Sequence, residues 1–165
     1  MRTLTVAFLL AIACTIVAVA PHEPVRGQQR YPQPKLPVVR IEAGIHVIRA
    51  ELADSAATRM IGLMGRESLG PNEGMLFVFE DKAVHCFWMR NTPLPLSIAF
   101  LDDDGRIVDI RQMAPRSDDS HCPSHPVRLA LEMEQGWFDR RGLREGARLT
   151  LPPGVQASRR RVTNP

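Results

Sequence analysis

The feature that most constrains the fold is a series of short, apolar, β-branched runs separated by turns. Residues 38–41 and 45–52 flank a tight turn at Ala43-Gly44, and residues 96–101 and 106–113 flank a turn rich in aspartate. Further runs suited to strands follow at 75–79, 86–89, 127–133 and 147–151. Connections this brief do not suit repeated helical crossovers between parallel strands. We therefore predict an α+β domain in which about seven strands form a mostly antiparallel, rolled or barrel-like sheet.

Helical periodicity is confined to two short segments. Residues 55–64 place apolar side chains on one face, behind Asp54 as a good N-cap, and Gly65 is expected to end that helix. Residues 137–141 fit one or two helical turns closed by Gly142. The sequence thus predicts one or two short helices beside the sheet.

The N-terminus has the pattern of an export signal. Arg2 precedes an apolar run that ends in the small residues Ala18-Val19-Ala20. Two alternatives stay open: residues 4–20 could be retained as a membrane anchor, because Pro21 disfavours cleavage, and Cys14 could mark a lipoprotein. All three place the body of the protein outside the cytoplasm, so we expect a periplasmic or secreted protein.

Proline spacing sets the domain boundaries. Prolines and glutamines between residues 21 and 37 leave no periodic apolar face, which predicts an extended tether. The predicted organisation is a signal peptide or N-terminal anchor (1–20), a proline-rich linker (21–37), a single β-rich domain (38–152) and a basic disordered tail (153–165).

The charge distribution argues against a nucleic-acid partner. The whole chain has a formal net charge of +3, but residues 38–155 contain 14 basic and 17 acidic side chains, a net charge of −3. The basic run Arg159-Arg160-Arg161 has no aromatic side chains beside it, so we interpret it as a solvated tail. We expect no nucleic-acid partner, and membrane contact only through an uncleaved N-terminal segment. The sequence does not identify a protein partner.

The cysteine count indicates one disulfide. If an export signal is removed, Cys14 goes with it, and Cys86 and Cys122 remain as an even pair in an oxidising compartment. A bond between them would close a loop of about 37 residues and stabilise the fold by roughly 4 kcal/mol on the chain-entropy model. The alternative is a pair of buried free thiols.

Several blocks of the sequence resemble one known family. They are residues 59–69, 73–79, 87–93 and 98–102, and residues 127–132 and 142–151 resemble the end of the same family. The chain is identified by these blocks, over about residues 38–152, as a member of the bacterial and archaeal family called domain of unknown function 192. This resemblance implies a compact β-rich domain, often exported, with no agreed activity.

Two details qualify what the resemblance implies. Many relatives place an aspartate at the position of Ser97, so a role for that carboxylate is not carried over to this chain. The pairs His85-Cys86 and His121-Cys122 resemble a cysteine-bearing subset of the family, which agrees with the disulfide inferred from the cysteine count.

A cluster of hydrogen-bonding side chains is our candidate ligand site. Arg90, Asn91 and Thr92 directly follow an apolar run that contains Trp88. An arginine offers a planar fork of donors, an asparagine offers a donor and an acceptor, and an indole stacks on rings or sugars. Arg59 on the predicted helix is a further candidate. In the alternative interpretation, Asn91 and Thr92 cap a turn and Trp88 is part of the core.

The histidines form a second candidate cluster. A bond between Cys86 and Cys122 would bring His85 close to His121 and His125. Three imidazoles could bind zinc or copper, but no fourth ligand has convincing spacing and a disulfide removes both thiolates. We therefore interpret the three histidines as a polar surface cluster and predict no metal site.

No recognised catalytic signature appears in the sequence. Asp109, Glu132 and Glu134 could pair as acid and base for glycoside cleavage, but their spacing does not place two carboxyls across one bond. We predict non-catalytic binding of a small polar ligand, an envelope glycan or a partner protein, without a cofactor. The alternatives are a cell-envelope hydrolase and a periplasmic metal-binding protein.

Overall fold

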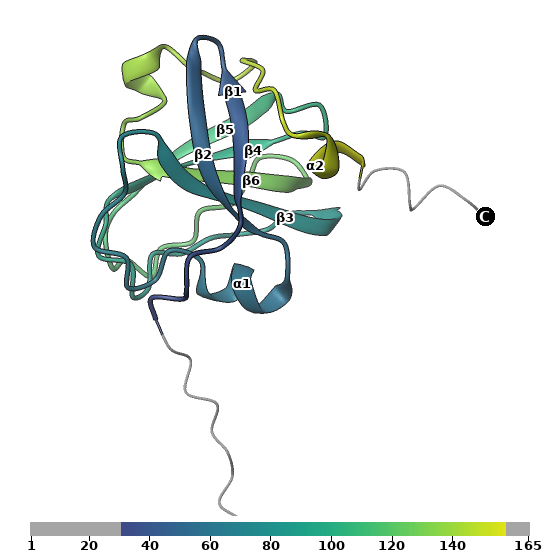
Figure 1. The fold of residues 1–165 in the computed structure, drawn as a ribbon. Helices are drawn as coiled ribbons and strands as arrows, with labels where there is room; N and C mark the ends of the chain where they lie inside the picture. Colours follow the sequence, from purple (N-terminus) through teal and green to yellow (C-terminus); the bar gives the residue numbers. More distant parts are fainter. Residues whose placement is uncertain (1–30, 158–165) are drawn as a thin grey trace, which may run out of the picture.

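A six-stranded sheet forms the centre of the protein (Figure 1). The computed structural model describes residues 31–157. Along the sheet the strands follow the order β1-β2-β3-β6-β4-β5, and every neighbouring pair except β2 and β3 is antiparallel. The strands are β1 (Val38–Ala43), β2 (His46–Ala53), β3 (Glu73–Ala83), β4 (Leu96–Leu101), β5 (Ile107–Met113) and β6 (Val127–Glu134). The predicted α+β, mostly antiparallel architecture is confirmed, with six strands in place of about seven.

The helices are shorter than their sequence patterns. Helix α1 (Ala56–Ile61) is capped by Ser55 and not by the predicted Asp54, because Ser55 and Thr58 form a reciprocal capping box. It ends before Gly62, which has a φ of +52°, and not at the predicted Gly65. The predicted helix at 137–141 is a 3₁₀-helix, η1 (Asp139–Arg141), closed by Gly142 as expected.

The two ends of the described chain extend beyond the predicted domain. Helix α2 (Pro153–Ala157) lies in the segment predicted to be a tail, and its Val155 is buried in the core. In the predicted linker, Gln33 is buried and donates hydrogen bonds to the carbonyl oxygens of Thr58 and Gly62. The predicted signal or anchor and the basic run at 159–161 lie outside the described residues. Within residues 31–157, no helix is long and apolar enough to cross a membrane.

One pair of strands departs from the antiparallel expectation. Strands β2 and β3 are parallel, with Arg49 opposite Glu73 and Ala53 opposite Phe77. The connection between them, residues 54–72, contains α1 and exceeds the dozen or so residues that a crossover needs. The expectation that all connections are too brief for a crossover was therefore wrong at this position.

Two predicted strands do not form. Residues 86–89 make only an isolated bridge, Phe87 to His121, because this segment covers a face of the sheet and does not join it. Residues 147–151 also make only isolated bridges. Their backbone bonds are divided between two neighbours, since Thr150 pairs with Glu42 of β1 while Arg148 pairs with Arg106.

The divided pairing of residues 147–150 explains the rolled character of the sheet. Strands β1 and β5 are the two edges, and this single segment bonds to β1 and to the residues that lead into β5. Figure 1 shows β1 and β2 crossing the other strands at a steep angle, which lets one segment reach both edges. The open sheet is thus curled, and its edges are covered by backbone hydrogen bonds.

Alternation along the strands creates two separate apolar clusters. On β6, Leu129, Leu131 and Met133 belong to a first cluster around Trp137, whereas Ala130 belongs to a second cluster with Phe100. Neighbouring residues of a strand point to opposite faces of a sheet, so each cluster occupies one face. The second face is covered by α1, the loop after it and residues 86–92, and it holds the candidate site.

Candidate functional site

A cavity of about 270 Å³ lies between α1 and the segment 86–92. Its walls are mainly apolar and aromatic. They are formed by Arg59, Met60, Ile61, Gly62, Leu63, Met64, Phe77, Phe79, Cys86, Phe87, Trp88, Thr92 and Glu132. With roughly 30 Å³ for each water molecule, this space would hold on the order of nine waters, or one small organic molecule.

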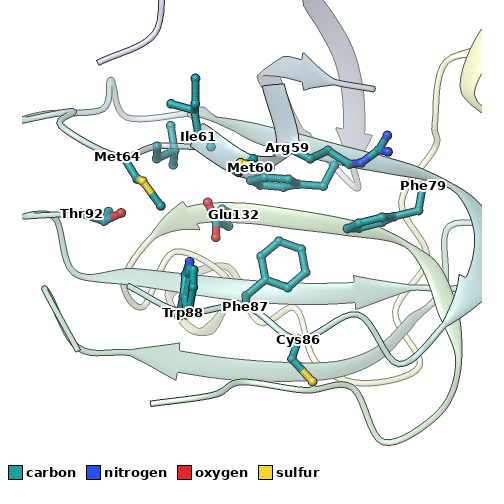
Figure 2. A pocket seen from close by; sticks show the side chains of 13 residues that line it. Arg59, Met60, Ile61, Met64, Phe79, Cys86, Phe87, Trp88, Thr92 and Glu132 are labelled. Atoms are coloured by element: carbon teal, nitrogen blue, oxygen red, sulfur yellow. The ribbon is translucent and has the colours of Figure 1, made fainter. Parts of the chain in front are cut away.

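Glu132 is the polar group at the centre of this cavity. Figure 2 shows its carboxyl among Thr92, Trp88 and Phe87 and the residues of α1. The register of β6 puts it there: Glu132 lies between Met75 of β3 and Ile98 of β4, on the same face as Ala130. The alternation that buries Leu131 on the opposite face therefore points an acidic side chain into apolar surroundings.

The carboxyl of Glu132 has no protein partner among the residues that the structure describes. The residue is 4% exposed, and among residues 31–157 no hydrogen bond or ion pair reaches its side chain. Burial without compensation disfavours the charged form and raises the pKa of Glu132 from 4.5 to about 8. The group is thus mainly a neutral acid at neutral pH, with one O–H donor and acceptor capacity to offer a ligand.

Arg59, a predicted site residue, lines the cavity but is held by other contacts. Its Nη1 donates to the carbonyl oxygens of Asp54 and Val78 at 2.8 and 2.7 Å, and its Nη2 donates to both carboxylate oxygens of Glu80 at 3.1 and 2.9 Å. It also lies 4.9 Å from the ring centre of Phe79. These contacts fasten α1 to β3, so Arg59 positions one wall of the cavity.

Trp88 and Thr92 are the predicted residues with side chains that face the cavity. Trp88 is 50% exposed, and no hydrogen bond to its indole nitrogen is made within the described part of the chain. Thr92 is buried, and its hydroxyl makes only a long contact of 3.5 Å with the Arg90 carbonyl. An indole N–H and a nearly free hydroxyl are therefore available to a bound molecule near Glu132.

Arg90 and Asn91, in contrast, do not line the cavity. Arg90 pairs with Asp118 at 2.8 Å, and its guanidinium stacks 4.4 Å from the centre of the Trp88 ring. Asn91 has a φ of +59°, and its amide donates to the Tyr31 hydroxyl at 3.2 Å. Asn91 thus occupies a left-handed turn position, but its printed side-chain bond goes to Tyr31 and not to the backbone, and Trp88 is half exposed and not part of the core, so the alternative interpretation holds only for the turn.

The disulfide fixes the wall opposite α1. Cys86 and Cys122 are bonded, with their Cα atoms 4.2 Å apart, as predicted. Next to this bond, Phe87 and His121 exchange two backbone hydrogen bonds of 2.9 and 2.8 Å. These links hold residues 86–89 over the sheet without making them a strand.

Each of the three histidines makes a different contact. His85 stacks on Phe79 at 3.6 Å, His125 contacts the hydroxyl of Ser124 at 3.0 Å, and His121 Nε2 is buried without a hydrogen bond in the described structure. Across residues 31–157, no group of three histidine, cysteine or acidic side chains is arranged to hold a metal ion.

The three carboxylates considered from the sequence are also separated. Asp109 accepts hydrogen bonds from Arg111 and from the backbone N–H of Ser124, and Glu134 pairs with Arg140 at the surface. Only Glu132 enters the cavity. The sequence shows Glu132 as an acidic residue in an apolar strand. Its position in the cavity depends on which strands lie beside β6 in the sheet, which the sequence does not show.

Comparison with known proteins identifies the family. Residues 38–151 match DUF192, described as "Uncharacterized ACR". The chain belongs to the DUF192 family. In this DUF192 protein the buried Ser97 hydroxyl contacts Gln112 Oε1 at 2.6 Å and accepts the Gly136 N–H at 2.8 Å.

Two solved structures share this fold. A protein of unknown function from Novosphingobium aromaticivorans DSM 12444 is 34% identical, covers 80% of this chain and 93% of its own, and superposes with a TM-score of 0.66. A protein from Sinorhizobium meliloti 1021, described as a "putative transcription regulator", is also 34% identical, with 68% and 90% coverage and a TM-score of 0.64. Comparison with curated proteins gives no match.

Proposed function

We propose that this protein is a binding module that holds a small molecule in the cavity between α1 and residues 86–92. The observation that carries the proposal is the Glu132 carboxyl, buried and unpartnered among the described residues of an otherwise apolar cavity. Burying such a group costs folding free energy, and no bond to another described side chain offsets that cost. A ligand that meets the carboxyl would recover that cost, which is a reason for the residue to be there.

The shape and chemistry of the cavity favour a particular kind of ligand. Its walls are mostly rings and aliphatic side chains, which suit an apolar or ring-containing body and not a fully hydroxylated sugar. Polar contacts would come from Glu132, the Trp88 N–H and the Thr92 hydroxyl. The expected ligand is therefore a small molecule with one polar end, a narrower class than the polar ligands considered from the sequence.

Binding is favoured over catalysis by what surrounds Glu132. Glycoside hydrolysis needs two carboxyl groups about 5–10 Å apart across the scissile bond. Among the residues that line the cavity, Glu132 is the one carboxyl, and Arg59 is held by Glu80 and backbone carbonyls. The hydrolase alternative thus lacks a second catalytic group in this part of the described structure.

We also propose that the protein is exported. The N-terminal signal pattern and the pairing of Cys86 with Cys122 support this location, because such bonds persist in oxidising compartments. Regulation of transcription, suggested by the description of the Sinorhizobium meliloti protein, is not favoured for this chain. The longest helix described, α1, has six residues, and residues 38–155 carry a net charge of −3.

A fragment screen by ligand-observed NMR tests the binding proposal. Fragments with an apolar body and one polar group should bind the oxidised protein and change the fluorescence of Trp88, since the other tryptophan, Trp137, is fully buried. Glu132→Gln and Trp88→Ala should weaken these fragments. Glu134→Gln is the matched control, because Glu134 lies on the same strand and is exposed. Fragments that bind all three variants alike, or that shift only resonances away from α1 and residues 86–92, would refute the proposal.

A further inference from the structure

The walls around Glu132 narrow the class of ligand further. Four aromatic residues line the cavity, Phe77, Phe79, Phe87 and Trp88. Aromatic faces attract cations, and the attraction grows when the cation is removed from water. A buried carboxylate together with several aromatic side chains is a combination suited to a positively charged group.

Within residues 31–157, no cationic side chain pairs with the Glu132 carboxyl. The only basic side chain among the described residues that line the cavity is Arg59, and its guanidinium is bonded to Glu80 and to two backbone carbonyls. Arg90, on the neighbouring segment, is bonded to Asp118 and stacks on Trp88. A cationic ligand would therefore meet Glu132 without competition from a protein cation.

The scarcity of hydrogen-bond acceptors distinguishes between kinds of cation. A primary ammonium group brings three N–H donors, and each must find an acceptor when it is buried. The side-chain acceptors that line the described cavity are the Glu132 carboxylate and the Thr92 hydroxyl. A fully methylated ammonium has no N–H to satisfy, and its methyl groups can contact Met60, Met64 and the rings.

On these grounds we propose that the cavity binds a methylated ammonium group, with Glu132 as its counter-ion and the aromatic side chains as its cage. This inference rests on the proposed binding function and specifies its ligand. The Trp88 N–H and the Thr92 hydroxyl would meet a polar group at the other end of the ligand. Choline has the required parts and is smaller than the cavity.

The pH dependence of binding should identify Glu132 as the counter-ion. A fixed cation pairs with the ionised carboxyl, so choline affinity should rise about tenfold for each pH unit up to the pKa of Glu132, about 8, and then level off. Strands β3 and β4 place Met75 and Ile98 opposite Glu132, α1 brings Arg59, and the segment 86–92 brings the disulfide-bonded Cys86 and Arg90. Two histidines stand behind the cavity wall without lining it, His85 stacked on Phe79 and His121 paired through its backbone with Phe87. Loss of the pH dependence in Glu132→Gln is therefore the result that assigns it to Glu132.

The decisive experiment compares choline with 3,3-dimethyl-1-butanol (dimethylbutanol below). This neutral isostere has a quaternary carbon in place of the choline nitrogen. Calorimetric titration at pH 8 should show choline binding at least about tenfold tighter than dimethylbutanol. Glu132→Gln should remove this preference and the pH dependence, and Glu134→Gln should keep both. Thermal unfolding of each variant checks folding, and Glu132→Leu serves as a second variant if Glu132→Gln unfolds.

Two contrary results separate the claims. If dimethylbutanol binds as well as choline, or if Glu132→Gln leaves choline affinity unchanged, the methylated-ammonium inference is overturned while small-molecule binding stands. If choline, dimethylbutanol and all members of the fragment screen fail to perturb α1 and residues 86–92, the proposed function fails as well.

Discussion

Two glutamates in this protein are equally buried and have opposite surroundings. Glu51 on β2 and Glu132 on β6 are each 4% exposed. Glu51 bonds Lys35 at 3.1 Å, Arg66 at 3.0 Å and the backbone N–H of Leu36 at 2.9 Å. Glu132 has no such partner among the described residues. One carboxylate is compensated by the fold, and the other has bonding capacity that no described side chain uses.

The difference shows that burial alone does not indicate a functional acid. The partners of Glu51 come from the start of the described chain and from the loop after α1, so its ion pairs tie those segments to the sheet. Glu132 faces a cavity where the equivalent partners would be. A buried carboxyl with a full set of donors is explained by structure, whereas one without them requires another explanation.

Removing the disulfide should greatly lower stability at neutral pH and should affect the Glu132 region first. Replacing Cys86 and Cys122 with serine should lower the free energy of unfolding by up to about 4 kcal/mol on the chain-entropy model. Denaturant unfolding measures the loss, with reduction of the native protein as a parallel condition. Hydrogen exchange should increase in residues 86–92 more than near Glu51. Equal increases in both regions would show that the disulfide does not act locally on the cavity wall.

Glu51→Ala should destabilise the protein by about 3 kcal/mol, because it leaves the mostly buried Arg66 without its carboxylate. Chemical denaturation at neutral pH measures this change. The matched variant is Glu42→Ala, which removes an exposed carboxylate paired with Arg40 and should cost less than about 1 kcal/mol. If Glu51→Ala were as mild as Glu42→Ala, the claim that Glu51 is a structural acid would fail.

At neutral and alkaline pH, Glu132→Gln should stabilise the protein, whereas Glu51→Ala should destabilise it. The folded-state pKa of about 8 lies above the ordinary value of 4.5, so the unfolded chain ionises first as the pH rises. The free energy of unfolding of the wild type is therefore highest below pH 4.5 and falls as the pH rises to about 8. The fall is no more than about 1.4 kcal/mol for each pH unit. Unfolding curves of the wild type and the variant between pH 4.5 and 8 should diverge, with the variant favoured at high pH. Parallel curves would mean that Glu132 is compensated after all.

Much of the fold could be predicted because it depends on local patterns. The hairpin β1–β2, the strand β4 and the turn before β5 follow from alternation and turn residues in their own segments. The wrong strand predictions at 86–89 and 147–151 have one physical cause. Apolar, β-prone residues there cover or bridge the sheet, and only the positions of distant neighbours decide between joining a sheet and packing on it.

The candidate site was less accessible to prediction for the same reason. The sequence drew attention to the segment containing Trp88 and Thr92, both of which line the cavity, because polar residues follow an apolar run there. It could not single out Glu132 from Asp109 and Glu134, since all three lie on or beside predicted strands. The distinction arises only when β6 is placed between β3 and β4, with α1 above it.

The smallest expected effect is that of Arg90→Ala. It tests whether a ligand binds in the cavity or at the surface cluster that the sequence predicted. Arg90→Ala removes an exposed ion pair and a stacking contact on Trp88, so it should cost about 0.5 kcal/mol of stability. Because Arg90 does not line the cavity, affinity for a bound fragment should change by less than about twofold. Thr92→Val, nearly equal in volume and inside the cavity, should weaken a ligand that bonds to the hydroxyl by about fivefold. If Arg90→Ala abolished binding while Thr92→Val did not, the ligand would lie on the surface around Arg90 and Asp118. The contrast between Glu51 as a structural acid and Glu132 as a ligand-binding acid would then fail.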